Sequence, residues 1–522
     1  MKNPSSVRVL ISLAVSLFFA LTTSVFAQSP SGDVVISSAT TWAAGNYQLS
    51  SLTVNSGATL TVGGGSIVTV SGAVVVTGNS NIVLQGGNTS AQVNNVWAGV
   101  GVTFNAALVE VDAGSSINAD GQGYVAGVSS AATAGAGPGG APSGSSVGGS
   151  YGGLGGSNSS GTAAAIYGSV NTPTDLGSGG SARCCLLVGG AGGGAMRLIV
   201  SGTLTNNGII SANGVSVSNQ AGGGAGGSVW ITTGALIGAG SIAANGGNGG
   251  ESGGGGGRIA VYYNGSSSSF TGFATSTATG GSGSAAGANG TAGFFDTSVT
   301  NSNLNVYQDF PLPANATLSY NAITVNAGAV LTIGGGTQVT VANALTVTGT
   351  VIALAANNTA QVSGNWQGAG VTINAATVQV DATGAISADG QGYVASAGPS
   401  GAPSGSSAGG SYGGLGGSNS FGTAGSIYGS ATAPTDIGSG GSARCCALVG
   451  GAGGGAIRLA VAGTLTNNGV ISANGVSVNN QAGGGSGGSV WITAGTLAGT
   501  GSIAANGGIG GEAGGGGGRI AV

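Results

Sequence analysis

The chain has 522 residues, of which 116 are Gly and only 10 are Pro, so collagen is excluded because it needs abundant Pro with Gly at every third position. Apolar residues make up 41% of the chain and the net charge is only −4, which excludes typical disorder. Only eight residues are Lys or Arg, and they form no basic patch, which excludes nucleic-acid binding.

Residues 1–27 are predicted to be a secretory signal peptide. Lys2 and Arg8 provide the positive start, Val9–Leu21 is the apolar stretch, and a small-residue cleavage site ends at Ala27. The alternative is a membrane anchor, but the apolar stretch is short for a span of about 20 residues. We therefore expect cleavage near Ala27 and a secreted, extracellular or cell-surface protein. No later stretch predicts a transmembrane segment.

Short alternating apolar pairs begin soon after the signal peptide. The first five pairs are Leu52/Val54, Leu60/Val62, Val68/Val70, Val74/Val76 and Ile82/Leu84, with starts 8, 8, 6 and 8 residues apart. This pattern predicts strands with one buried face, separated by turns of Gly, Asn and Ser. Three strands give a lap of roughly 22 residues, within the range of solenoid repeats.

The predicted fold class is therefore all-β: a parallel β-helix, or solenoid, with projecting glycine-rich loops. We expect right-handed coiling, because crossover connections between parallel strands are right-handed. A β-sandwich is the alternative, but its strands are usually longer, about 5–6 residues.

A recurring phrase, Ile-x-Ala-[Asn/Asp]-Gly, precedes each glycine-rich excursion. It begins at Ile117, Ile210, Ile242, Ile386, Ile471 and Ile503. Stacked Asn side chains can hydrogen-bond as a ladder, so these residues are interpreted as structural. The excursions should leave one edge of the coil side by side. They are either extended segments packed as in polyglycine II, where Gly permits close approach, or disordered loops.

Two large repeat units are predicted, 33–306 and 307–522. The first comprises a solenoid (33–121), a long Gly-rich excursion (122–194), a solenoid with shorter Gly-rich excursions (195–263) and a linker (264–306). The second unit opens with apolar pairs of the same spacing. The difference in residue number between equivalent positions of the two units is 271 at the start and 261 near the end. The second unit stops at the counterpart of Val261, so we expect a truncated second unit of a longer protein.

Two kinds of phrase resemble known repeat proteins. Leu52-Thr-Val-Asn-Ser-Gly-Ala-Thr-Leu-Thr-Val62 resembles the β-solenoid segments of bacterial haemagglutinin-like and adhesin-like exoproteins. Gly222-Gly-Gly-Ala-Gly-Gly-Ser-Val-Trp-Ile231 and Gly253-Gly-Gly-Gly-Gly-Arg-Ile-Ala-Val-Tyr-Tyr263 look like glycine-rich repeats of secreted or surface proteins of environmental bacteria. With the second copies, the resemblance covers most of the mature chain. It implies a surface repeat protein and no family catalytic residues.

No cofactor or metal site is predicted. Gly189–Ala195 superficially resembles a dinucleotide-binding loop, but it lacks the following helix and the acidic residue of a βαβ unit. Calcium bound by Asp and turn carbonyls is an alternative, but the dense Asp spacing of known Ca²⁺ loops is absent.

The candidate carboxylates for polysaccharide hydrolysis are Asp112 and Asp120, with Asp381 and Asp389 as their counterparts. Hydrolysis by a carboxylate pair needs the two groups about 5–10 Å apart. Lyase chemistry usually needs a basic proton acceptor, and Lys and His are missing from the mature chain. We therefore predict that the protein is not an enzyme.

One set of charged residues recurs 261 residues later. The set comprises Arg183, Arg197, Arg258, Asp175 and Glu251. The simplest interpretation is ion pairs that clamp the bases of the excursions. An anion-binding site for a ligand is the alternative.

The four cysteines, Cys184, Cys185, Cys445 and Cys446, are candidates for disulfides because export makes oxidation favourable. A bond between sequence neighbours is strained, since their Cα atoms lie only about 3.8 Å apart. Pairing between repeats or between molecules is the other option, so the connectivity stays open. The spacing of a CxxC metal site is not met.

The sequence thus predicts a non-enzymatic structural or adhesive protein, acting as a stalk, a matrix element or an adhesin. Its expected partners are glycans, cell surfaces or copies of itself, and not nucleic acid. One alternative is a polysaccharide-active β-helix protein of the lyase or hydrolase kind. A second alternative is an ice-binding protein that uses flat Thr or Gly faces.

Overall fold

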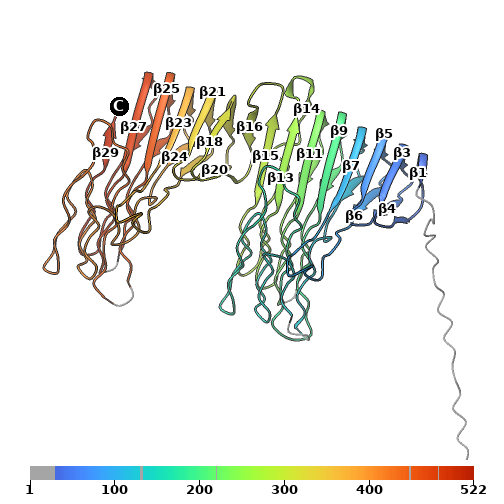
Figure 1. Ribbon diagram of the computed structural model, residues 1–522, viewed down its shortest axis with the longest axis horizontal. Helices are drawn as coiled ribbons and strands as arrows, with labels where there is room; N and C mark the ends of the chain where they lie inside the picture. Colours follow the sequence, from blue (N-terminus) through green and yellow to red (C-terminus); the bar gives the residue numbers. More distant parts are fainter. Residues whose placement is uncertain (1–29, 130–132, 219, 446–447, 480) are drawn as a thin grey trace, which may run out of the picture.

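The computed structural model describes residues 30–129, 133–218, 220–445, 448–479 and 481–522. In these residues the regular structure is nearly all β-strand, with no α-helix and one short 3₁₀ helix, η2 (Gly265–Ser267). The strands lie side by side along a rod, and glycine-rich loops hang from one side of it in two groups (Figure 1). The all-β prediction is confirmed, whereas the predicted signal peptide, 1–27, lies outside the described residues.

Within the described residues one large sheet holds seventeen strands. They are β1 (Ser31–Ile36), β3 (Asn46–Val54), β5 (Ile67–Val76), β7 (Val102–Val111), β9 (Ala195–Asn206), β11 (Ser228–Gly238), β13 (Arg258–Tyr263), β14 (Ser269–Phe270), β15 (Thr291–Asp296), β16 (Asn303–Val306), β18 (Thr317–Tyr320), β19 (Ala322–Val325), β21 (Gln338–Val347), β23 (Val371–Val380), β25 (Ala456–Asn467), β27 (Ser489–Ala498) and β29 (Arg519–Ala521).

Two smaller sheets, each of six short strands in this part of the chain, flank the large one. The first holds β2 (Thr40–Trp42), β4 (Thr59–Val62), β6 (Asn81–Leu84), β8 (Ser116–Asn118), β10 (Ile209–Ser211) and β12 (Ser241–Ala243). The second holds β17 (Phe310–Leu312), β20 (Val330–Ile333), β22 (Thr350–Ala353), β24 (Ala385–Ser387), β26 (Val470–Ser472) and β28 (Ser502–Ala504).

The chain alternates between the large sheet and a small one. After β5 it runs through β6 and returns as β7, which pairs with β5 in parallel, while β8 pairs with β6 in parallel. Each lap therefore places one long and one short strand beside those of the lap before. Among the described strands every pairing is parallel except that of β15 with β16.

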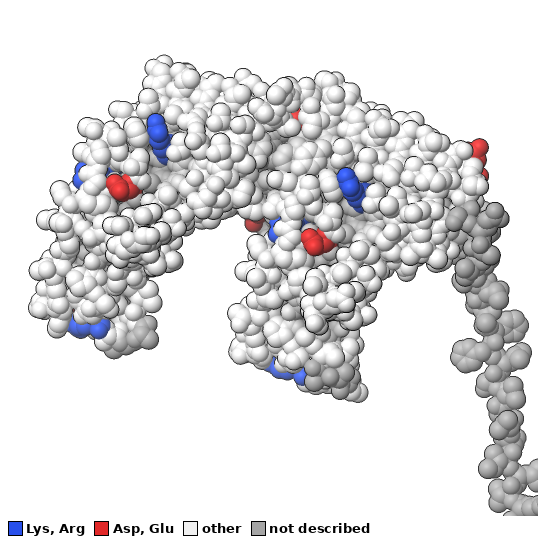
Figure 2. All heavy atoms as spheres, viewed as in Figure 1, with Lys and Arg blue, Asp and Glu red and all other residues white. Residues whose placement is uncertain are grey.

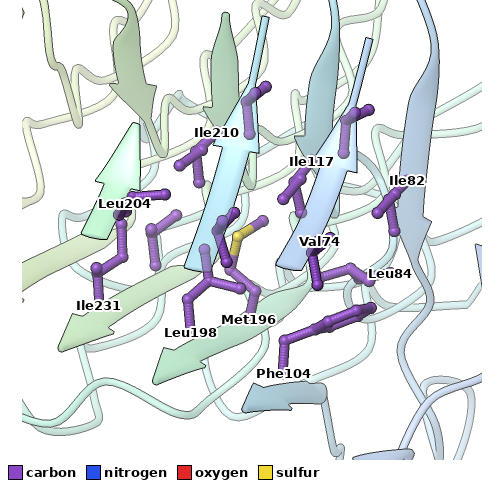
Figure 3. Close-up of a cluster of buried hydrophobic side chains, with 14 of the residues drawn as sticks. Val74, Ile82, Leu84, Phe104, Ile117, Met196, Leu198, Leu204, Ile210 and Ile231 are labelled. Atoms are coloured by element: carbon purple, nitrogen blue, oxygen red, sulfur yellow. The ribbon is translucent and has the colours of Figure 1, made fainter. Parts of the chain in front are cut away.

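The apolar pairs found in the sequence point inward. All ten residues of the first five pairs are at most 2% exposed. Side chains of successive laps stack on one another inside the rod, where Val74, Ile82 and Leu84 lie next to Ile117 of the following lap (Figure 3). Burial of these aliphatic side chains is the main stabilising contribution, at roughly 1.5–3 kcal/mol for each.

Pairs spaced by six residues differ from the prediction, because they share one strand instead of forming two. Val68/Val70 and Val74/Val76 both belong to the ten-residue β5, which shifts register between Val70 and Ala73. Only three residues, 71–73, lie between Val70 and Val74. They are too few for a turn that leaves the sheet, so β5 bends and stays in the sheet. At the bend, a Cβ on Gly72 would collide with the carbonyl oxygen of Ser50 in the neighbouring strand.

The two halves of the molecule meet at β15, and each has its own core. Phe294 belongs to the core of the first half, whereas Phe295 belongs to the core of the second half together with Leu304 and Phe310. The large sheet thus continues from one half into the other, but the buried side changes. The segment 264–306, predicted as the linker, contains η2, β14, β15 and β16.

Candidate functional site

The glycine-rich excursions are ordered and pack against one another in two arms. The first arm consists of the described residues of 121–194, 214–227, 246–257 and 277–290, and the second of those of 390–455, 475–488 and 507–518. Backbone hydrogen bonds join successive segments of the first arm, from Gly193 N to Ala225 O (2.8 Å), Gly226 N to Gly255 O (2.9 Å) and Gly256 N to Ala288 O (2.9 Å). Of the two possibilities left open by the sequence, the structure has the ordered one.

Close backbone approach explains why these segments are glycine. A Cβ on Gly193 would collide with the carbonyl oxygen of Ala212, and one on Gly224 with that of Ala191. Any side chain would force the segments apart and break the bonds between them. The fourth segment, 277–290, was not recognised in the sequence. Its glycine density, followed directly by the apolar β15, is the signal that could have revealed it.

Stacked polar side chains mark the edge where the arms leave the rod. The Oδ1 atom of Asp120 accepts the backbone N–H of Asn213 (2.6 Å), Asn213 Oδ1 accepts that of Asn245 (2.8 Å), and Asn245 Oδ1 accepts that of Thr279 (2.8 Å). Asp389, Asn474 and Asn506 repeat the arrangement in the second half. A ladder is therefore present, but its bonds run from side-chain oxygens to backbone N–H groups and not between stacked Asn side chains as predicted.

The four candidate carboxylates all have structural partners. Asp120 Oδ2 also accepts the hydroxyl of Ser211, and Asp112 accepts that of Thr77. Asp112 follows β7 and Asp120 follows β8, so the two stand at opposite ends of a short strand. In the second half, Asp389 accepts the hydroxyl of Ser472, and Asp381 accepts the hydroxyl of Thr348 and the side-chain amide of Gln379.

The base of each arm is held by a buried polar cluster. In the first arm, the hydroxyl of Tyr151 lies 2.7 Å from Ser228 Oγ, which donates to the carbonyl of Asp175. Arg258, only 2% exposed, donates from Nε and Nη2 to the carbonyl of Tyr167 (3.0 and 2.7 Å) and lies over the Tyr151 ring. The same contacts recur around Tyr412 and Arg519 in the second arm.

Ion pairs form for only part of the predicted set, and they lie at the middle of the excursions 246–257 and 507–518, not at the excursion bases where the clamps were predicted. Arg183 pairs with Glu251 at 3.3 Å, and Arg444 with Glu512 at 3.5 Å. Arg258 instead donates from Nε and Nη2 to the backbone carbonyl of Tyr167 at the arm base, while its buried Nη1 has no hydrogen-bond partner. On the face shown in Figure 2 charged groups are sparse, and arginine and acidic groups recur in a similar arrangement at the two arms.

A vicinal disulfide lies in the first arm. Cys184 is bonded to Cys185, with Cα atoms 3.8 Å apart, in a stretch where the next residue, Leu186, is 81% exposed. Cys445 is also disulfide-bonded, and Cys446 lies outside the described residues. The sequence left two options open, a bond between sequence neighbours and a bond between repeats or molecules. For Cys184 and Cys185 the structure has the bond between neighbours.

A pocket of about 380 Å³ lies between the base of each arm and the large sheet. The first is lined by residues 65–67, 99–103, 173–175 and 195–197, and the second by 336–338, 368–372, 434–436 and 456–458. Every lining residue of one pocket has its counterpart in the other. The whole site is thus duplicated along the rod.

One row of in-register residues on the outer face of the sheet supplies three lining residues of the pocket and continues beyond it to a tryptophan. It runs from Ile67 through Thr103 and Arg197 to Trp230, each opposite the next in neighbouring strands. The Arg197 guanidinium carbon lies 3.9 Å from the centre of the Trp230 ring. The second row is Gln338, Thr372, Arg458 and Trp491, with Arg458 at 4.3 Å from the ring of Trp491.

The pocket brings together two opposite charges that do not neutralise each other. Asp175 and Arg197 both line it, yet the ion pairs within the described residues join neither to the other. The buried Nε of Arg197 has no hydrogen-bond partner. Burial raises the pKa of the Asp175 carboxyl, although the charge of Arg258 opposes this shift. Both groups retain hydrogen-bonding capacity for a ligand.

The sequence analysis named Arg197 and Asp175 but interpreted them as members of ion pairs, and it did not name Thr103. The recurrence of Trp230 as Trp491 was the available signal in the sequence. No protein-family profile, curated protein or solved structure matches the chain.

Across the described ranges, no group of three or more His, Cys, Asp or Glu residues is placed to hold a metal ion. The same ranges contain no helix with the length and apolar character needed to cross a membrane.

Proposed function

We propose that the protein is a secreted or cell-surface structural and adhesive repeat protein without catalytic activity. In this proposal the laps form a right-handed parallel β-solenoid, and the arms are polyglycine-II-like bundles. The parallel pairing of successive laps and the hydrogen bonds between arm segments support the two assignments. The signal-peptide pattern of residues 1–27 supports export.

The observation that carries the proposal is the repetition of the whole rod-and-arm unit, with both arms on the same side of the rod (Figure 1). Equivalent surfaces presented twice on one stiff scaffold can engage a repetitive target with avidity well above that of one contact. The arms also expose apolar side chains, including Leu186 at 81%, Leu415 at 68% and Val449 at 65%. Such residues supply contact area for a partner surface.

Purified mature chain should bind cell surfaces, immobilised glycans or other copies of itself, and should release no product from polysaccharides. Sedimentation, surface-binding and reducing-sugar assays measure these three properties. Absence of all binding would contradict the proposal, and so would turnover of a polysaccharide. N-terminal mass spectrometry of the exported protein should find a mature end near Gln28.

A further inference from the structure

We propose that the two equivalent pockets at the arm bases are saccharide-binding sites, each of which takes one neutral sugar unit of a polysaccharide. The proposal rests on the adhesive function above and specifies its ligand. It follows from the chemistry of the lining, the open shape of the pocket and its duplication.

The lining suits hydroxyl groups, which donate and accept hydrogen bonds at once. The guanidinium of Arg197 supplies donors, and the Asp175 carboxylate supplies acceptors. Thr103 adds a hydroxyl of its own. A polyhydroxylated ligand can satisfy both charged groups together, whereas a simple apolar ligand would leave both unpaired.

The charge balance favours a neutral sugar over an acidic one. Arg197 would attract a uronic acid carboxylate, but Asp175 lines the same pocket and would repel it. Asp175 is already half-buried, so a second carboxylate beside it would add to an existing desolvation cost. A neutral hexose or pentose avoids this repulsion and keeps the hydrogen bonds.

The pocket is large enough for a sugar ring and is open to solvent. Its volume of about 380 Å³ lies at the lower end of the range for ligand sites, roughly 300–1,000 Å³. An open pocket of this size fits one unit while the chain continues on both sides. Two such pockets on one rod can then hold two units of the same polymer.

The pockets differ in one respect that bears on affinity. Ile67 and Val100 of the first pocket are Gln338 and Ala369 in the second. The first pocket therefore offers more apolar surface to the C–H groups of a sugar ring. We expect it to be the tighter of the two sites.

Calorimetric titration of the full chain with cellopentaose, xylopentaose, mannopentaose and pentagalacturonic acid tests the proposal. At least one neutral oligosaccharide should bind with two sites per chain, and the acidic one should bind more weakly. The double variant Arg197→Ala/Arg458→Ala should weaken binding by about tenfold or more, because it removes charge-assisted hydrogen bonds. Thr103→Val/Thr372→Val keeps the side-chain shape and should cost about fivefold.

Arg183→Ala/Arg444→Ala is the matched control, because it removes the same residue type from the ion pairs with Glu251 and Glu512. It should leave binding unchanged, and thermal unfolding should show that all variants are folded. The proposal is overturned if none of the three neutral oligosaccharides binds, if the control pair weakens binding equally, or if pentagalacturonic acid binds more tightly. If the chain still attaches to surfaces or self-associates in those cases, the adhesive function stands and only the pocket assignment fails.

Discussion

Phe294 and Phe295 are neighbours in β15, yet each is buried in a different hydrophobic core. Phe294 is fully buried against Phe273 and Tyr307, with ring centres 5.1 and 5.6 Å away. Phe295 is 4% exposed and stacks on Tyr262 at 4.5 Å. Successive side chains of a strand point to opposite faces, so β15 contributes the last residues of the first core from one face and the first residues of the second core from the other.

Replacing either phenylalanine should destabilise a different half of the molecule. Phe294→Ala and Phe295→Ala should each cost about 3–5 kcal/mol, as is typical for a buried aromatic side chain. Hydrogen exchange should show the loss of protection in β12 for the first variant, because its Ile242 lies in the first core. For the second variant the loss should appear in β17, because its Phe310 contacts Phe295 in the second core. Phe421→Ala is the control, because that side chain is 54% exposed. Loss of protection in the same strands for both variants would contradict the two-core arrangement.

The stability of the polar ladder should depend on the presence of each side-chain oxygen and not on whether that oxygen is charged. Asn213→Ala removes the acceptor for the backbone N–H of Asn245 and should cost about 1 kcal/mol. Asn213→Asp keeps an oxygen at that position and should cost less. Exchange of the Asn245 amide measures the effect directly. Equal exchange rates in the two variants would show that the side-chain oxygen does not hold this amide.

The interior of the laps could be read from the sequence because it depends on local alternation. Leu52, Val54 and their successors repeat with a period of two, and the recurrence of Asn before Gly marks the ladder. Both signals lie within a few residues, so chain folding elsewhere does not alter them.

The meeting of the two cores at β15 and the pocket at each arm base could not be predicted in the same way. Phe294 and Phe295 interrupt the alternation, which is the pattern of a strand buried on both faces, but two residues do not identify what covers each face. Thr103 and Arg197 are opposite each other only because the excursion between them returns to the rod at the start of β9, directly beside β7. That excursion has no periodicity, so the sequence carries no signal for the register it produces.

Two carboxyl groups should give opposite dependences of stability on pH. Burial raises the pKa of Asp175 above its ordinary value of 3.8. The folded arm therefore holds this proton at a higher pH than the unfolded chain does, and stability falls as the pH rises from 3.8 through the folded pKa. Asp175→Asn should remove this loss and stabilise the first arm at neutral pH. Thermal unfolding across the acidic range measures it, and a less stable Asp175→Asn variant at neutral pH would contradict it.

For Asp296, burial raises the pKa, but hydrogen bonds from Ser298, Gly265 and Asn303 outweigh it and the net pKa is lowered below 3.8. Its contribution to stability is present above 3.8 and is lost as the pH falls through the folded pKa. The stability difference between the native chain and Asp296→Asn should therefore shrink on acidification. A difference that stays constant from neutral to acidic pH would show that the carboxylate charge does not hold the β15–β16 turn.

The close packing of the first arm can be tested with a pair of equivalent glycines. A Cβ on Gly256 would collide with the carbonyl oxygen of Ala278 and the nitrogen of Gly290, because the segment 277–290 lies against it. At Gly517, the counterpart of Gly256 in the second arm, nothing lies within 4 Å of that Cβ position. Gly256→Ala should therefore cost about 1–3 kcal/mol by overpacking, whereas Gly517→Ala should be close to neutral.

Limited proteolysis and hydrogen exchange of the two arms measure this contrast within one chain. Gly256→Ala should expose the segment 277–290 to cleavage and speed exchange of the Gly256 amide, which is bonded to Ala288 O. Both substitutions make the same change of residue type, so a general effect of replacing glycine would appear in both arms. An equal response would show that chain entropy, and not the close approach of backbones, dictates glycine at this position.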